Sequence, residues 1–153
     1  MNIFVLHDEP NVAAQMACDK HVVKMILETA QMLCTVALSH GVGAPYSQTH
    51  AKHPCTLWAG ESQGNWEWLI EYGFALCAEY TKRYKRVHKS QAAIEHCSKL
   101  DLNFARIERT PFAQAMPNQY KDECAVTAYR AYYHGEKAYF ATWKTQSPGW
   151  WKL

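Results

Sequence analysis

Six polar residues follow one another at helical spacing in an otherwise apolar stretch near the N-terminus. They are Lys20, His21, Lys24, Glu28, Gln31 and Thr35. At about 100° per residue, these six positions fall on one side of a helical wheel, within roughly 100° of one another. Ammonium, imidazole, carboxylate and amide groups would therefore share one helix face, and this mixture of groups can bind an anion or transfer protons.

Lys24 lies one turn from both His21 and Glu28, and its chemistry depends on its surroundings. A partly desolvated lysine is a nucleophilic amine that can form a Schiff base, whereas a charged lysine binds phosphate, with Glu28 or His21 as acid or base. The alternative is an ordinary amphipathic helix with a weak Lys24–Glu28 ion pair. We expect His21, Lys24 and Glu28 to line a ligand pocket together with the loop that holds His50 and His53.

That loop contains the pattern His50-x-x-His53-x-Cys55, which resembles the spacing of a metal site. A structural zinc ion needs four ligands, and no fourth ligand is evident in the sequence. We therefore expect no metal and no cofactor. Two histidines in a polar loop more often bind phosphate or lie in solvent.

Basic and aromatic side chains gather in two other stretches, and this combination is typical of nucleic-acid surfaces. The first stretch contains Lys82, Arg83, Tyr84, Lys85, Arg86, His88 and Lys89. The second contains Tyr129, Arg130, Tyr132, Tyr133, Lys137 and Trp143. Trp66 could also stack on a base, although packing in the core is the commoner role of a tryptophan.

Helices must position these residues. The periodicity predicts helices over residues 11–39, 65–85, 90–100 and 122–134, and a shorter helix that begins at Pro54. Gly41 and Gly43 should end the first helix, Gly60 and Gly64 should separate the next two, and Gly135 should interrupt the last. We expect residues 101–121 to be irregular and the tail to expose Trp150 and Trp151.

Length and composition indicate one domain. The chain has 153 residues, of which 48% are hydrophobic, and it contains no repeat or linker. We therefore expect a single all-α domain over residues 1–153, with about four to six helices around the long N-terminal helix. The formal charge of +2 is small, so any anion must bind to a local patch rather than to the whole molecule.

The cysteines and the N-terminus indicate a cytoplasmic protein. The six cysteines are widely spaced, with no Cys-x-x-Cys pair, and the first residues do not resemble a signal peptide. Polar residues interrupt the apolar region 22–38, so no membrane span is expected. The sequence also lacks a Walker loop, a dinucleotide fingerprint, Gly-x-Ser-x-Gly and His-Glu-x-x-His, which excludes common NTPase, dehydrogenase, hydrolase and metalloprotease classes.

The whole chain resembles small phage-encoded proteins grouped with the pyrimidine dimer DNA glycosylases, whose prototype is of the phage endonuclease V type. The stretches that carry this resemblance are MNIFVL, DKHVVKMILETAQML, HPCTLW, AEYTKRY, TPFAQAMP and AYRAYY. The resemblance implies an all-helical enzyme that flips a nucleotide out of the duplex, attacks the sugar with its N-terminal amine and uses a glutamate of its first helix. It places Met1 at the attacking amine and the segment from Asp19 to Lys24 near the carboxylate.

The sequence departs from the family pattern at two points. Asn2 is bulky, which favours retention of Met1, whereas the family exposes a small residue as its mature terminus. The segment from Asp19 to Lys24 contains no glutamate, and Glu28 lies one turn further along.

From these observations we expect a DNA-repair glycosylase with lyase activity on damaged or modified pyrimidines. Met1 or Lys24 would supply the amine that attacks C1′, and Glu28 or Asp19 would assist. The residues expected to contact DNA are Lys20, His21, Gln31, His50, His53, Trp66, Arg83, Tyr84, Arg86, Arg130 and Lys137. The alternatives are a non-catalytic protein that sequesters a nucleotide or oligonucleotide, such as a phage counter-defence factor, and an interaction protein without a small ligand.

Overall fold

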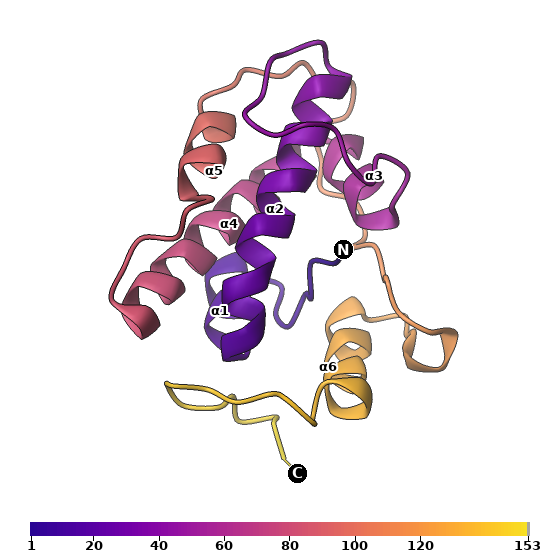
Figure 1. Ribbon diagram of the computed structural model, residues 1–153. Coiled ribbons are helices and arrows are strands. Elements are labelled where there is room, and N and C mark those ends of the chain that lie inside the picture. Colours follow the sequence, from indigo (N-terminus) through magenta and orange to yellow (C-terminus); the bar gives the residue numbers. More distant parts are fainter. Residues whose placement is uncertain (153) are drawn as a thin grey trace.

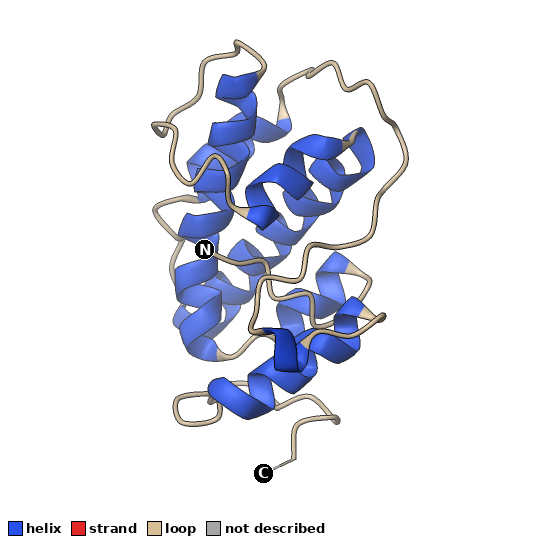
Figure 2. Ribbon diagram, turned by 90° about the vertical axis from the view of Figure 1, so that its right-hand side faces the viewer, coloured by secondary structure: helices blue, strands red, loops and turns tan. Residues whose placement is uncertain are grey.

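The computed structural model describes residues 1–152, and this part of the chain contains helices and loops but no strand (Figures 1 and 2). The helices are α1 (Pro10–Met16), α2 (Asp19–Ser39), α3 (Pro54–Glu61), α4 (Gln63–Tyr84), α5 (Gln91–Ser98) and α6 (Ala125–Glu136), with a 3-10 turn, η1 (Asn118–Tyr120), before α6. The expected all-α fold is confirmed.

Helix α2 is the centre of the core. It packs against α3, α4 and α5, and the N-terminal segment, with Ile3, Val5 and Leu6 fully buried, runs beside its middle turns (Figure 1). By length and by a mean hydropathy of 1.4, α2 could cross a membrane, in contrast to the expectation from sequence. However, 67% of that apolar window is buried within the protein, as the central helix of a core requires.

The single helix expected over residues 11–39 is divided into α1 and α2, because Ala17 and Cys18 are extended. Tertiary contacts replace the helical hydrogen bonds at this break. Arg83 Nη1 donates to the Ala17 carbonyl at 2.8 Å, and the Cys18 amide donates to the Tyr133 hydroxyl at 3.3 Å. Partners more than 60 residues away therefore determine where α2 begins.

The expected break between α3 and α4 is confirmed, and Ser62 accounts for it by accepting a hydrogen bond from the Asn65 amide at 3.1 Å. The role predicted for Gly135 is wrong, because this residue lies inside α6. A Cβ atom at position 135 would collide with the ring of Tyr120, so the glycine allows η1 to approach α6 closely. Residues 101–121 are irregular, as predicted, apart from η1.

The C-terminal segment packs against α1 and α6, so the prediction of two exposed tryptophans is also wrong. The ring of Trp151 stacks on His134 with a centroid distance of 4.8 Å, and the Arg130 guanidinium lies 5.1 Å from the Trp150 ring. The indole of Trp143 donates to the Met16 carbonyl at 3.0 Å. Both terminal tryptophans are half-buried as a result.

A buried ion cluster joins α4 to the turn between α1 and α2. The side chain of Arg83 is 0% exposed and contacts Glu79 Oε1 at 2.9 Å and Asp19 Oδ1 at 3.1 Å. Its remaining donors reach backbone carbonyls of the turn. This arrangement satisfies the guanidinium completely and fixes the start of α2.

We predict that Arg83→Met, which keeps much of the side-chain volume but removes the charge, destabilises the fold by about 3–5 kcal/mol. The variant leaves two partly buried carboxylates and two carbonyls without their partner. Urea denaturation measures the loss. Lys82→Met, at the exposed neighbouring position, is the control and should change stability by no more than about 0.5 kcal/mol. Equal stability of the two variants would contradict this role of Arg83.

Candidate active site

The N-terminal segment brings the α-amine of Met1 to Glu28 in the middle of α2. The amine nitrogen lies 3.1 Å from Glu28 Oε1, and the Glu28 side chain is only 9% exposed. The backbone amide of Asn2 donates to the same oxygen at 3.1 Å. Lys24 Nζ lies 3.7 Å from the other oxygen, Oε2. Oε1 of Glu28 is thus contacted by two backbone nitrogens, whereas Oε2 faces the solvated ammonium of Lys24.

Asn2 holds the amine in this position. Its side-chain amide donates to the Ala115 carbonyl at 2.7 Å, and its side-chain oxygen accepts from the Ile3 amide at 2.7 Å and the Phe4 amide at 3.3 Å. Phe4 adopts a φ of 43°, which is rare for a bulky side chain. The chain therefore turns sharply after Asn2, and this turn directs the amine toward Glu28.

An aromatic cluster lies between the N-terminal segment and α6. The Phe4 ring stacks on His21 with a centroid distance of 4.1 Å, and His21 Nδ1 lies 2.6 Å from the Tyr133 hydroxyl. Burial, together with the positive charges of Lys137, Lys24 and Lys20, lowers the pKa of His21 to about 3. His21 is therefore neutral near pH 7.

Lysines and aromatic rings form a cationic surface beside Glu28. Lys137 Nζ lies 5.7 Å from the Phe4 ring and 4.8 Å from the Tyr132 ring, and Lys20 Nζ lies 4.8 Å from the Phe140 ring. With Lys24, these residues provide cations next to flat apolar rings. Such a surface can pair with phosphates and stack on bases.

The loop before α3 approaches the same amine. His53 Nδ1 accepts a hydrogen bond from the Cys55 amide at 3.1 Å. Partial burial lowers the pKa of His53, and the positive charge of the Met1 amine and the charge of His50 add to this effect. Burial raises the pKa of Cys55 to about 12, so its sulfur is a thiol rather than a metal-binding thiolate. Within residues 1–152, no three His, Cys, Asp or Glu side chains converge on a metal position.

The predicted polar stripe does not open into a single slot. His21 is buried under aromatic rings, whereas the side chain of Lys24 is 66% exposed, so of the two environments considered for Lys24 the solvated one is found. Gln31 is half-buried one turn beyond Glu28. Thr35, further along the stripe, exchanges hydrogen bonds of 3.0 and 3.1 Å with the backbone of Thr49 and so anchors the loop.

The two acidic residues proposed to assist the amine differ in position. Glu28 contacts the amine, whereas Asp19 lies nine residues earlier in α2, about 13 Å along the helix axis. Asp19 instead accepts hydrogen bonds from Arg83 and from the Lys144 amide, at 3.1 and 3.0 Å. The position expected for Asp19 beside the amine is therefore wrong.

The structure places several predicted DNA contacts away from this surface. Arg83 is fully buried, so it cannot contact a phosphate. Tyr84 is half-buried with Lys144 Nζ 5.4 Å from its ring, and Arg86 donates to the Tyr80 hydroxyl at 3.0 Å.

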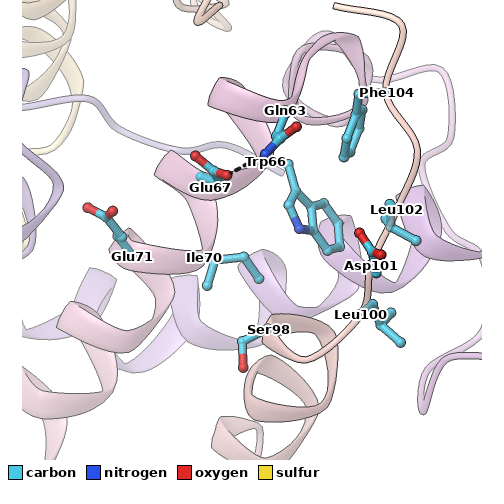
Figure 3. A pocket seen from close by; sticks show the side chains of 10 residues that line it. All are labelled: Gln63, Trp66, Glu67, Ile70, Glu71, Ser98, Leu100, Asp101, Leu102 and Phe104. Atoms are coloured by element: carbon cyan, nitrogen blue, oxygen red, sulfur yellow. Dashed lines mark hydrogen bonds between the residues drawn. The ribbon is translucent and has the colours of Figure 1, made fainter. Parts of the chain in front are cut away.

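Two further predicted contacts also have partners within the fold. The Arg130 side chain donates to the Leu6 carbonyl at 3.0 Å. Trp66 is 5% exposed and packs near Phe104 at the floor of a separate groove (Figure 3). His50 remains exposed on the loop.

Sequence reasoning missed the roles of Asn2 and Phe4, which position the amine. It counted Tyr133 among the residues of a nucleic-acid surface, whereas this side chain is buried and contacts both His21 and Cys18. A polar residue inside the apolar start MNIFVL was the one available signal for Asn2. The contacts of Phe4 and Tyr133 depend on segments more than 100 residues apart, so helical periodicity could not predict them.

The low pKa of His21 predicts that acid weakens the fold. Between pH 6.5 and about 3, the unfolded chain binds a proton at His21 that the folded chain does not, so stability falls as the pH falls, by up to about 1.4 kcal/mol per pH unit. His21→Asn removes this contribution, and its stability should depend less on pH over that range. NMR of the imidazole nitrogens should find His21 neutral at pH 5; a midpoint near 6.5 would contradict the burial argument.

Comparison with known proteins identifies the family of the chain. A family model described as pyrimidine dimer DNA glycosylase matches residues 1–92, which is more than half of the chain. The matched part includes Met1, Glu28 and the loop with His50 and His53. No curated protein and no solved structure matched the chain. The chain therefore belongs to the pyrimidine dimer DNA glycosylase family, whose substrate is DNA.

Proposed function

We propose that this protein is a DNA glycosylase with lyase activity on damaged or modified pyrimidines, and that the α-amine of Met1 is its nucleophile. The observation that carries the proposal is the 3.1 Å contact between this amine and the nearly buried carboxylate of Glu28. An amine beside a general base is the arrangement that nucleophilic catalysis through a Schiff base requires.

Glu28 has a defined role in the proposed reaction. Its Oε1 accepts a proton from the ammonium, and the freed nitrogen lone pair attacks C1′ of a flipped nucleotide. The bond between C1′ and the base breaks, and the base leaves with the electron pair and takes up a proton. The adduct keeps its sugar ring closed until the C1′–O4′ bond breaks, and O4′ leaves with the electron pair and takes up the proton that Glu28 holds. The resulting iminium between the Met1 nitrogen and C1′ makes the C2′ proton acidic. Removal of that proton expels the 3′ phosphate and cleaves the strand.

The contacts favour Met1 over Lys24 as the nucleophile. Lys24 Nζ is solvated on a side chain that is 66% exposed, and it lies 3.7 Å from Glu28 Oε2. A solvated ammonium is a poor nucleophile near neutral pH. We assign Lys24 to a phosphate of the substrate instead, next to the outward-facing oxygen of Glu28.

The cationic surface supports DNA binding next to the amine. Lys20, Lys24 and Lys137 all act on His21 electrostatically, so their charges lie close together. Extrusion of a nucleotide costs a few kcal/mol, and stacking on exposed parts of Phe140 or Tyr132 would offset part of this cost.

Borohydride trapping with duplex DNA that contains an abasic site tests the chemistry, because only a Schiff base is reduced to a stable adduct. We expect wild-type protein to be trapped and peptide mapping to find the adduct on Met1. Glu28→Gln keeps the shape of the side chain but removes the base, and it should lower the trapping rate by about 10²–10⁴-fold. Lys24→Met should still be trapped, with weaker binding. An adduct on Lys24 instead of Met1 would show that Lys24 is the nucleophile and would contradict the proposed role of Met1.

Binding without any trapped adduct would overturn the catalytic proposal and favour sequestration of nucleic acid. Circular dichroism of Glu28→Gln provides the control for folding. Loss of the ion pair with the Met1 amine is expected to lower stability, so the rates are compared at a temperature at which both proteins are fully folded.

The cationic surface predicts a salt-dependent interaction with DNA. In Lys20→Gln/Lys137→Gln, the slope of log K against log salt should decrease by about 0.9 for each phosphate that the variant no longer neutralises. Lys99→Gln, at an exposed position after α5, is the matched control and should leave the slope unchanged. Fluorescence anisotropy with a short duplex measures the slope. An unchanged slope in the double variant would exclude this surface as the DNA site.

A further inference from the structure

An acidic groove lies on the side of α4 that is turned away from α2. Glu67 and Glu71 are both exposed, lie one helical turn apart and form one wall of the groove, and Asp101 lies on the segment after α5 (Figure 3). The groove has a volume of about 340 Å³. Its apolar lining is Trp66, Ile70, Leu100, Leu102 and Phe104.

The carboxylates of this groove are not neutralised by the fold. Within residues 1–152, Glu67, Glu71 and Asp101 form no ion pair, and Glu67 accepts only a hydrogen bond from Gln63, at 2.9 Å. Like charges one turn apart on a helix repel each other and destabilise it. Glu79, on the same helix, is by contrast paired with Arg83. The acidic pair thus weakens α4, and no ion pair within the described residues offsets this repulsion.

A second acidic groove adjoins the first at Glu67 and Glu71 of α4. It is also bordered by Asp8 and Glu9. The one cation among its lining residues, Arg109, lies 4.9 Å from the Phe112 ring. The acidic residues of the two grooves, Glu67, Glu71, Asp101, Asp8 and Glu9, together cover more surface than one compact ligand requires. The length of this acidic surface suits an extended peptide segment with several cations.

DNA is not the occupant, because its phosphates would be repelled by these carboxylates. The lysines that could pair with phosphates lie instead around His21. We propose that the groove binds a segment of a partner protein in which Lys or Arg residues flank one large apolar side chain. The apolar side chain packs on the floor formed by Trp66 and Leu102, and the cations meet the carboxylates of the rim, an arrangement typical of protein interfaces with an apolar centre and a polar edge.

Anisotropy with a fluorescein-labelled peptide, acetyl-Lys-Arg-Leu-Phe-Lys-Arg-amide, tests the proposal on the full chain. We expect saturable binding that weakens at least fivefold in Glu67→Gln/Glu71→Gln, since both residues are exposed and the variant should fold normally. Glu123→Gln/Glu136→Gln makes the same change in charge at exposed positions before and in α6, and should change the affinity by less than twofold. Replacing Leu-Phe in the peptide by Ser-Gly should also weaken binding at least fivefold.

Three results would overturn the proposal: no saturable binding, equal loss of affinity in the two double variants, or equal binding of the Ser-Gly peptide. Self-association of the chain that disappears in Glu67→Gln/Glu71→Gln would assign the groove to a second copy and would also overturn it. Borohydride trapping of the same variants should be unchanged, so the outcome for the groove is independent of the proposed glycosylase activity.

Discussion

The contact between the Met1 amine and Glu28 is the constraint around which this end of the molecule is organised. Glu28 lies in the middle of the central helix α2, where an unpaired buried carboxylate would cost several kcal/mol. The amine supplies the compensating charge, and it reaches Glu28 because the N-terminal segment runs beside α2 and turns at Phe4. Asn2 then ties that segment to the irregular region near Ala115. The amine of Met1 is therefore held next to a carboxylate by contacts that also stabilise the fold.

Asp19 and Glu28, both in α2, differ in what surrounds their carboxylates. Asp19 is held by a fully buried guanidinium and by a backbone amide, so it fixes the start of the helix. Glu28 keeps one oxygen beside an exposed lysine. Exposure does not distinguish the two residues, because the side chains of Asp19 and Glu28 are 13% and 9% exposed, but of the two Glu28 is the one that contacts the Met1 amine.

Charge is distributed unevenly over the surface although the net charge is only +2. Lys20, Lys24 and Lys137 lie near the amine, while Glu67 and Glu71 line the exposed face of α4. Because oppositely charged faces recognise different partners, the chain can bind a polyanion at one face while the other stays free. The net charge alone therefore does not indicate that positive and negative side chains lie on different faces.

Periodicity and capping are local properties, so they are enough to predict the all-helical class, the starts of α3 and α4, and the helix face that His21, Lys24 and Glu28 share. The family resemblance directed attention to Met1, and the family model bears out that relationship over residues 1–92. Neither the local sequence pattern nor the family resemblance indicates which polar groups are buried.

Long-range packing determines three further features: Glu28 rather than Asp19 contacts the amine, Lys24 stays in solvent, and Arg83 is buried. Each of these features depends on contacts between residues far apart in the chain. Asn2 and Glu28 are 26 residues apart, and Arg83 and Asp19 are 64 residues apart. Helical periodicity defines a face, but the elements that pack on that face determine whether a charge on it is solvated, paired or available for chemistry.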